Sequence, residues 1–203
     1  MDDRGADHGQ LHVQPFLDLA NPDAPKLGGT VTLPGVAWTQ DAHVTGPMLA
    51  MTHFESLQGK DGAWFGSYWL DRIDISQPNA PKALAKINIP GWLVGLSPDG
   101  KSAVTLDWQV KAGTKPEDSK VENTLHLVGL TDGKAVVHKS VTLANQAGAT
   151  LRHGDAVYVA TWPYWWQWPA AATGGDVATE LLVFDAKNPT TFGQGAVLQT
   201  GSG

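Results

Sequence analysis

An internal repeat of about 54 to 57 residues is the feature of this 203-residue sequence that most constrains its fold. Residues 18–26 read DLANPDAPK and residues 74–82 read DISQPNAPK, so their first prolines are 78 − 22 = 56 positions apart. Residues 185–189 keep the same four-residue step from Asp to Pro. A short apolar segment with strand character follows each copy, which indicates a supersecondary unit that recurs along the chain.

Three turn glycines, Gly46, Gly100 and Gly154, provide a second signal, with spacings of 100 − 46 = 54 and 154 − 100 = 54 residues. Each glycine separates a short strand-like segment from a longer apolar one. We name the four strands of one period a to d: a and b flank the glycine turn, and c and d flank the Asn-Pro or Gln-Pro turn. In the copy over residues 127–143, a Thr131-Asp-Gly133 turn replaces the prolines.

These patterns predict an all-β fold, a β-propeller made of four-stranded antiparallel blades. The repeats run roughly over residues 17–66, 67–122, 123–179 and 180–203, within a single propeller region that covers residues 1–203. No stretch of about ten residues has helical periodicity, and Gly or Pro interrupts every candidate. A β-sandwich would also contain many short strands but would not explain a four-strand repeat, and a β-helix needs a much shorter period.

The two halves of the repeat do not occur equally often, because four c–d units accompany three a–b units. A propeller closes to remove its exposed sheet edges. We therefore expect a partial propeller of about three and a half blades, a fragment of a longer one. In this fragment, one edge of the first c–d hairpin is unpaired or covered by loops.

The segment over residues 73–91, repeated over residues 17–35, resembles secreted bacterial β-propeller-domain proteins with LVIVP-type repeats. The SPDGK sequence of residues 97–101 resembles the turn between the first two strands of many WD40-like and YVTN-type blades. This resemblance implies a propeller and a parent protein that is secreted or lies at the cell surface. It implies no particular activity, since the motifs it covers are structural.

Composition excludes several classes of function. Lys and Arg (14) are outnumbered by Asp and Glu (20), the net charge is −6, and no basic run is present, so we expect no nucleic-acid partner. The chain has no Cys, which excludes disulfides, thiolate metal sites and a cysteine nucleophile. No run approaches the roughly 18 apolar residues of a membrane-spanning helix, so we expect no membrane insertion. The first ten residues do not have the pattern of a signal peptide, and the compartment stays unassigned.

The three b–c connections, at roughly residues 56–66, 111–122 and 162–179, are long and dissimilar, and variable loops on a rigid scaffold are where binding usually occurs. The third loop contains WPYWWQWP at residues 162–169, with five aromatic residues in seven positions. Such rings could stack on a sugar or a peptide, or they could fold inward as a small core that covers the blade ends. The predicted ligand-binding residues are Trp64, Trp162, Tyr164, Trp165, Trp166 and Trp168.

The sequence contains less evidence for a catalytic site than for a ligand-binding site. The seven histidines are scattered, no metal site or cofactor is indicated, and no nucleophile elbow or phosphate-binding loop is present. Asp18, Asp74 and Asp185 are expected to make Asx-type hydrogen bonds in the c–d turns. We therefore predict a non-catalytic propeller module that presents its b–c loops to a protein or carbohydrate ligand. The alternative is a hydrolase or lactonase-type enzyme with its site at the central channel, although the starts of strands a are mostly apolar.

The aromatic loop yields a direct test. If its rings form a binding platform, at least two of them face solvent, and the double substitution Trp165→Ala/Trp166→Ala abolishes ligand binding without changing the melting temperature. If the rings are core, the same change lowers the free energy of unfolding by several kcal/mol, at roughly 3–5 kcal/mol per buried Trp. Thermal unfolding measured beside a binding assay separates the two results.

Overall fold

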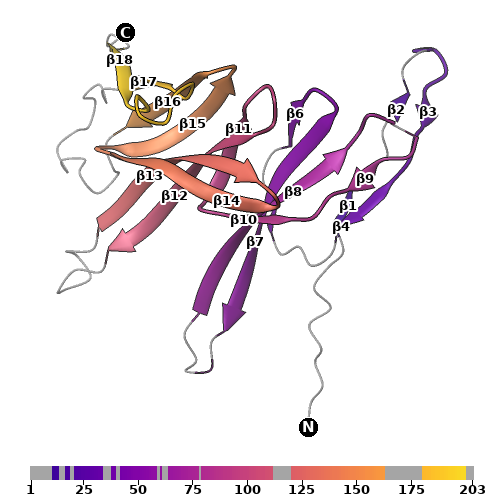
Figure 1. Cartoon of the computed structure of the whole chain (residues 1–203), viewed down its shortest axis with the longest axis horizontal. Helices are drawn as coiled ribbons and strands as arrows, with labels where there is room; N and C mark the ends of the chain where they lie inside the picture. Colours follow the sequence, from indigo (N-terminus) through magenta and orange to yellow (C-terminus); the bar gives the residue numbers. More distant parts are fainter. Residues whose placement is uncertain are drawn as a thin grey trace, which may run out of the picture. The chain divides into compact units, whose positions relative to one another are not determined.

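The computed structural model describes residues 11–13, 17–18, 21–33, 38–39, 42–58, 60, 64–77, 79–111, 120–162 and 180–199 (Figure 1). Every regular element in this part of the chain is a β-strand, and none is a helix. The prediction of an all-β fold is confirmed. By its internal contacts the chain forms two compact units, residues 1–92 with 132–134 and residues 93–131 with 135–203.

Three antiparallel sheets contain most of the strands. The first sheet has the path β10-β8-β7-β5, with β6 also paired to β7 and β9 also paired to β8; the second is β11-β12-β13-β14 and the third is β15-β16-β17-β18. The strands of the first sheet are β5 (Trp38–Thr39), β6 (His43–Thr45), β7 (Met48–Gln58), β8 (Trp64–Asp74), β9 (Lys82–Ala83) and β10 (Ile87–Ile89). Those of the second are β11 (Trp92–Leu96), β12 (Ser102–Lys111), β13 (Lys120–Thr131) and β14 (Lys134–Leu143). Those of the third are β15 (Gln146–His153), β16 (Ala156–Trp162), β17 (Glu180–Asp185) and β18 (Gln194–Gln199).

Each sheet follows the predicted order a, b, c, d, with neighbours in sequence paired side by side. In the first sheet both a and d are interrupted, so a consists of β5 and β6 and d consists of β9 and β10. A separate N-terminal hairpin precedes them, in which β1 (Leu11–Val13) pairs with β4 (Val31–Leu33) and β2 (Leu17–Asp18) pairs with β3 (Lys26–Leu27). This hairpin lies where the sequence predicts the first c–d unit.

The glycine turns explain the 54-residue spacing. Gly46, Gly100 and Gly154 have φ values of 53°, 69° and 60°, in the left-handed region that glycine adopts without steric cost. The b strands that follow them begin at residues 48, 102 and 156, so successive b strands start 54 residues apart. The repeat observed in the sequence is therefore a repeat of strand pairing.

The proline turns are equally regular. The amide of Ala24 donates to the carbonyl of Asn21 at 3.1 Å, Ala80 donates to Gln77 at 2.8 Å, and Thr191 donates to Asn188 at 3.0 Å. These are four-residue turns with proline in the second position, where its fixed φ is suitable.

The predicted Asx bonds are confirmed at two of the three aspartates. The Asp74 carboxylate accepts from the amide of Ser76 and the Asp185 carboxylate accepts from that of Lys187, both at 2.9 Å. The Asp18 side chain lies outside the described residues. In the second sheet the turn is Asp132-Gly133, with φ values of 50° and 74°, as in a two-residue hairpin turn.

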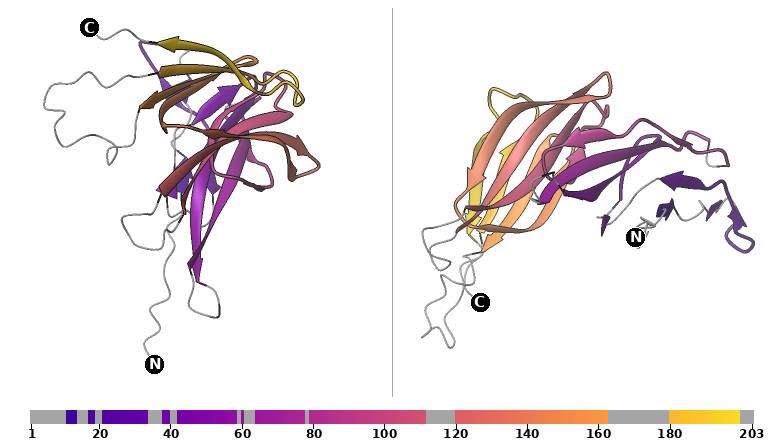
Figure 2. Two further views of the ribbon diagram at one scale, coloured as in Figure 1. Left: turned by 90° about the vertical axis from the view of Figure 1, so that its left-hand side faces the viewer. Right: turned by 90° about the horizontal axis from the view of Figure 1, so that it is seen from below.

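The second and third sheets pack face to face within their unit, as layers that Figure 2 shows from two sides. Their common core contains Val94, Val104, Leu125, Leu127, Leu143, Val157, Val159, Leu182, Phe184, Ala186 and Phe192. Phe184 and Phe192 are in ring contact, with centroids 5.8 Å apart. In the other unit, Val31 of the hairpin packs against Leu49, Met51 and Ile73 of the first sheet.

Candidate functional site

A buried histidine, His53, occupies the middle of strand β7 in the first sheet. Its register partner on β8 is Trp69, and the preceding same-face residue on β7, Met51, pairs with Asp71. Because antiparallel partners share a face, His53 and Asp71 are diagonal neighbours on one side of the sheet. The His53 side chain has no exposed surface, and Asp71 is 5% exposed.

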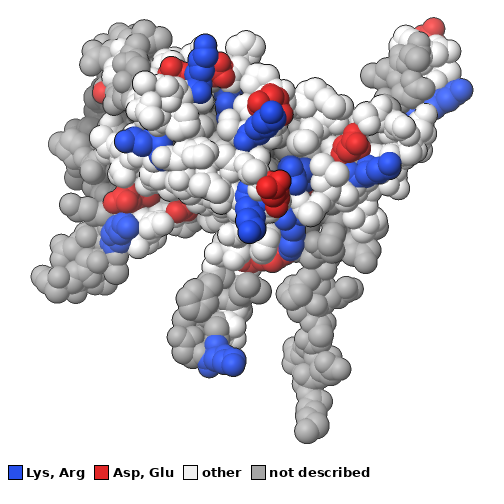
Figure 3. All heavy atoms as spheres, in the orientation of Figure 1, with Lys and Arg blue, Asp and Glu red and all other residues white. Residues whose placement is uncertain are grey.

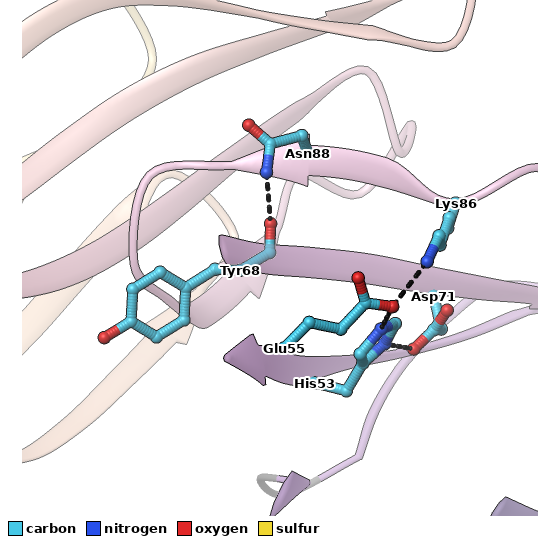
Figure 4. Close-up of polar contacts among 6 residues, drawn as sticks. All are labelled: His53, Glu55, Tyr68, Asp71, Lys86 and Asn88. Carbon is cyan, nitrogen blue, oxygen red and sulfur yellow. Dashed lines mark hydrogen bonds and ion pairs between the residues drawn. The ribbon is translucent and has the colours of Figure 1, made fainter. Parts of the chain in front are cut away.

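Both ring nitrogens of His53 face carboxylates (Figure 4). Nδ1 is bonded to Oδ2 of Asp71, and Nε2 lies 3.1 Å from Oε1 of Glu55. Lys86, just before β10, donates to the same Glu55 oxygen at 2.6 Å. The Lys86 ammonium also lies 4.3 Å from the centroid of the Trp69 ring, in cation–π geometry. The four charged residues form a chain across strands b, c and the start of d, called here the His53 network.

The charges favour an imidazolium at the centre of this network. Burial lowers the pKa of His53, but hydrogen bonds and charge attraction from Asp71 and Glu55 outweigh it and raise the pKa above its ordinary value. Burial likewise raises the pKa of Glu55, but Lys86 and His53 outweigh it and hold the pKa below its usual range. One imidazolium and one ammonium then balance two carboxylates, as buried charges require.

This geometry does not suit His53 as a general base. A base needs a free nitrogen lone pair within reach of a substrate proton, whereas both nitrogens of His53 donate to carboxylates and the ring is fully buried. What the arrangement does is join strands b, c and d by charge-assisted hydrogen bonds, which are shorter and stronger than neutral ones.

The second sheet has polar residues at the same positions. On strand b, His53 and Glu55 correspond to Asp107 and Gln109, since 53 + 54 = 107 and 55 + 54 = 109. Gln109 donates to Asp107 at 2.9 Å, so the contact between b-strand residues two apart also recurs.

The counterparts on strands c and d complete the set. His126 pairs with Thr105, the counterpart of Met51, and therefore takes the place of Asp71. Ser140 takes the place of Lys86, since 86 + 54 = 140, and its hydroxyl lies 2.8 Å from Nδ1 of His126. The histidine and the aspartate have exchanged strands between the two sheets. The third sheet has Leu182 and Thr161 at the positions of Asp71 and His53, so the polar set occurs in two of the three sheets.

The polar set of the second sheet is less completely hydrogen-bonded than the His53 network. Nε2 of His126 is buried and has no hydrogen-bond partner. Burial lowers the pKa of His126, the nearby Asp107 charge raises it, and the net shift is downward. Ser140 and His126 resemble a nucleophile and its base, but the carboxylate that would orient the imidazole is bonded to Gln109.

Of the predicted ligand-binding residues, Trp64 is the first residue of β8 and Trp162 is the last of β16. Trp162 is 36% exposed, and its ring covers Gly148 so closely that a Cβ there would lie 2.0 Å from ring carbons. The side chain of Trp64 and all of Tyr164, Trp165, Trp166 and Trp168 lie outside the described residues. The sequence analysis placed both residues within b–c loops, but each is a strand residue that flanks a b–c connection, because the paired strands extend further than predicted.

Sequence reasoning missed a further exposed aromatic residue. Trp108 on β12 is 51% exposed, and Val110, two residues on and on the same face, is 58% exposed. Val110 pairs with Val121 of β13, so all three lie on one face at the b–c end of the second sheet. The spacing of 54 between Phe54, Trp108 and Trp162 was the available signal. In the first sheet Phe54 is covered by Tyr68, with ring centroids 5.1 Å apart.

No protein-family model matches this chain, and no curated protein has a sequence that matches it. Among the described residues no group of three or more His, Cys, Asp or Glu has a geometry that could hold a metal ion. In the same residues no helix is long and apolar enough to cross a membrane. On the face drawn in Figure 3, basic and acidic side chains are interspersed and neither sign forms a block.

The exchange of histidine and aspartate between sheets suggests a swap experiment. His53→Asp places a third carboxylate beside Asp71 and Glu55, and we expect it to lower the free energy of unfolding by about 3–5 kcal/mol. His53→Asp/Asp71→His restores the pair in the orientation of the second sheet and should recover most of that loss. Urea unfolding measures both. His153→Asp, at an exposed histidine, is the control and should change stability by less than about 0.5 kcal/mol. No recovery in the double variant contradicts the equivalence of the two networks.

The network also predicts how stability depends on pH. The folded-state pKa of His53 is raised above its unfolded value of about 6.5, so its contribution is complete below that pH and is lost as pH rises through the folded-state pKa. We expect the free energy of unfolding to fall as pH rises above about 6.5. His53→Gln/Asp71→Asn, which removes the titrating pair, should show a smaller fall. Equal slopes for the two proteins would contradict the assignment.

Proposed function

We propose that this chain is part of a β-propeller and serves as a non-catalytic binding module that presents its b–c loops to a protein or carbohydrate ligand. Support for the propeller comes from three antiparallel sheets that share the same strand order and the same glycine turn between strands a and b. Their b strands start 54 residues apart. Each sheet is a meander whose strands follow one another in space, which is the composition of a propeller blade.

The observation that carries the binding proposal is the exposure of Trp108. A Trp ring gains a large hydrophobic free energy on burial, and the Trp108 side chain remains 51% exposed beside two valines. Trp108 lies beside Val110 and Val121 at the end of the second sheet from which the b–c loop departs. Trp162 holds the corresponding position in the third sheet and is also exposed. Aromatic side chains at corresponding positions of successive sheets suit a ligand that stacks on rings.

The alternative function is a hydrolase, and its best candidate among the described residues is the Ser140–His126 pair. The serine is exposed and its partner histidine has a lowered pKa, so the imidazole is neutral near neutral pH. In a catalytic triad, a carboxylate bonded to the second ring nitrogen orients the imidazole. Here Asp107 is bonded to Gln109 and Nε2 of His126 has no partner, so the imidazole is not held in this way. We therefore favour binding.

The test compares the protein with Trp108→Ala and with Val137→Ala, the latter at an exposed valine on β14. Each is titrated with cello-, chito- and malto-oligosaccharides by tryptophan fluorescence and applied to an immobilised peptide library. We expect binding by the native protein, at least tenfold weaker binding by Trp108→Ala, and unchanged binding by Val137→Ala. Melting temperatures should stay similar, since both sites are exposed. Absence of binding in both assays, or ester hydrolysis that Ser140→Ala abolishes, contradicts the proposal.

A further inference from the structure

Strand β14 forms a long edge of the second sheet. The sheet has the order β11-β12-β13-β14, so β13 pairs with one side of β14, and no strand of the described chain pairs with the other side. β14 has 10 residues, whereas strand d of the first sheet is divided into β9 and β10, with 2 and 3 residues. It contains no proline, which would remove a backbone donor. A row of backbone N–H and C=O groups therefore faces outward along this edge.

The first part of β14 is accessible on both faces of the sheet. Val136 and Val137 point to opposite faces, because side chains alternate along a strand, and they are 52% and 47% exposed. Leu143, at the end of the strand, is buried and belongs to the core. β14 thus has a buried end that fixes it in its unit and an accessible stretch over residues 134–140.

A complete propeller would leave this edge open. In the proposed propeller the sheets stack around a channel, and strand d is the outermost strand of each sheet. The second sheet already has one sheet before it and one after it in the chain. Further sheets of the ring would therefore cover neither its faces nor the outer side of β14.

The charges beside the two valines of β14 are positive. Lys134 precedes the first valine by two residues, Lys139 follows the second by two, and the strand contains no acidic residue. Both lysines are exposed, and the ion pairs described for lysines belong to Lys86 and Lys111 instead. The edge therefore presents the order basic-x-apolar-apolar-x-basic in a chain whose net charge is −6.

These charges discriminate between partners. If two copies of β14 paired antiparallel about their valines, Lys134 of one copy would stand opposite Lys139 of the other. Like charges directly opposite destabilise a strand pair, and lysine on an edge is a common device against self-association. A strand with acidic residues at the same two positions would meet opposite charges, and apolar residues between them would meet the valines.

We infer that the open edge of β14 is a docking site for an extended acidic segment of a partner protein, which adds to the second sheet as a fifth strand. Main-chain hydrogen bonds supply affinity in strand addition, and the alternate side chains supply specificity. The spacing of the lysines and valines predicts the pattern acid-x-apolar-apolar-x-acid in the partner. The pattern reads the same in both chain directions, so it suits a parallel or an antiparallel partner strand.

A labelled peptide with the sequence ETVVTE, extended by Gly-Ser at both ends, tests the inference. Fluorescence anisotropy from about 1 to about 1,000 µM protein covers weak binding. The native chain should bind this peptide. Lys134→Glu/Lys139→Glu should bind it at least about tenfold more weakly and should gain binding of the peptide KTVVTK, because both charge pairs are reversed.

The control variant is Lys101→Glu/Lys187→Glu, which makes the same change in net charge at two exposed lysines outside the strands. It should bind ETVVTE like the native chain, and circular dichroism verifies that each variant is folded. Equal loss of binding in this control, or no binding of ETVVTE by the native chain over the whole range, overturns the inference.

Two further measurements separate strand addition from charge attraction alone. ETVVTE with N-methyl groups on both valines keeps its charges but loses the backbone donor that must face β14, so it should not bind. Hydrogen exchange of the amides in residues 134–140 should slow when the unmodified peptide binds. Equal binding of the methylated peptide overturns strand addition.

The inference and the proposed function can fail separately. Trp108→Ala should bind ETVVTE like the native chain, since Trp108 lies on β12 and not on the edge strand. Loss of peptide binding in Trp108→Ala would move the peptide site to the b–c end of the sheet and overturn the assignment to β14. Loss of glycan binding in the same variant concerns only the proposed function.

Discussion

The central strands b and c of these sheets carry apolar side chains toward both faces, and the rest of the structure depends on covering them. Residues 156–160 read AVYVA and residues 181–184 read LLVF, continuous apolar runs of the kind found in sheets buried on both sides. A single four-stranded sheet of this composition cannot be stable in water, because one covered face still leaves the other exposed. Sheets must therefore stack, and the core between the second and third sheets is the direct result.

Burial sets limits on polar residues within a sheet, and the His53 network shows how the first sheet meets them. A histidine with no exposed surface requires partners for both ring nitrogens, and Asp71 and Glu55 supply them. In the second sheet the same positions hold Asp107, Gln109, His126 and Ser140, which have lower total charge and leave one nitrogen unpartnered. The second sheet has its aspartate on strand b and its histidine on strand c, the reverse of the first sheet, but Asp107 is bonded to Gln109 and His126 to Ser140. The residue types are thus retained, whereas the direct bond between histidine and aspartate is described only in the first sheet.

The accessible aromatic residues lie where stacking no longer covers the strands. Strand β12 begins in the core at Val104 and ends exposed at Trp108 and Val110, before the b–c connection. The strand thus has a buried half that holds the sheets together and an exposed half that can meet a ligand. A rigid sheet positions such rings at low entropic cost, which is why the b–c end carries the functional proposal.

The sequence by itself determined the strands, their order and their turns. Glycines at 46, 100 and 154 adopt left-handed backbone conformations, and the Asn-Pro and Gln-Pro steps form tight turns. Because both kinds of turn depend on a few neighbouring residues, they can be predicted from the sequence. Even the equivalence of Phe54, Trp108 and Trp162 was present in the spacing. Only the tertiary structure decided which of them is covered, since burial depends on neighbouring sheets. The same holds for His53: its partner Asp71 is 18 residues away, and only the strand register brings the two together.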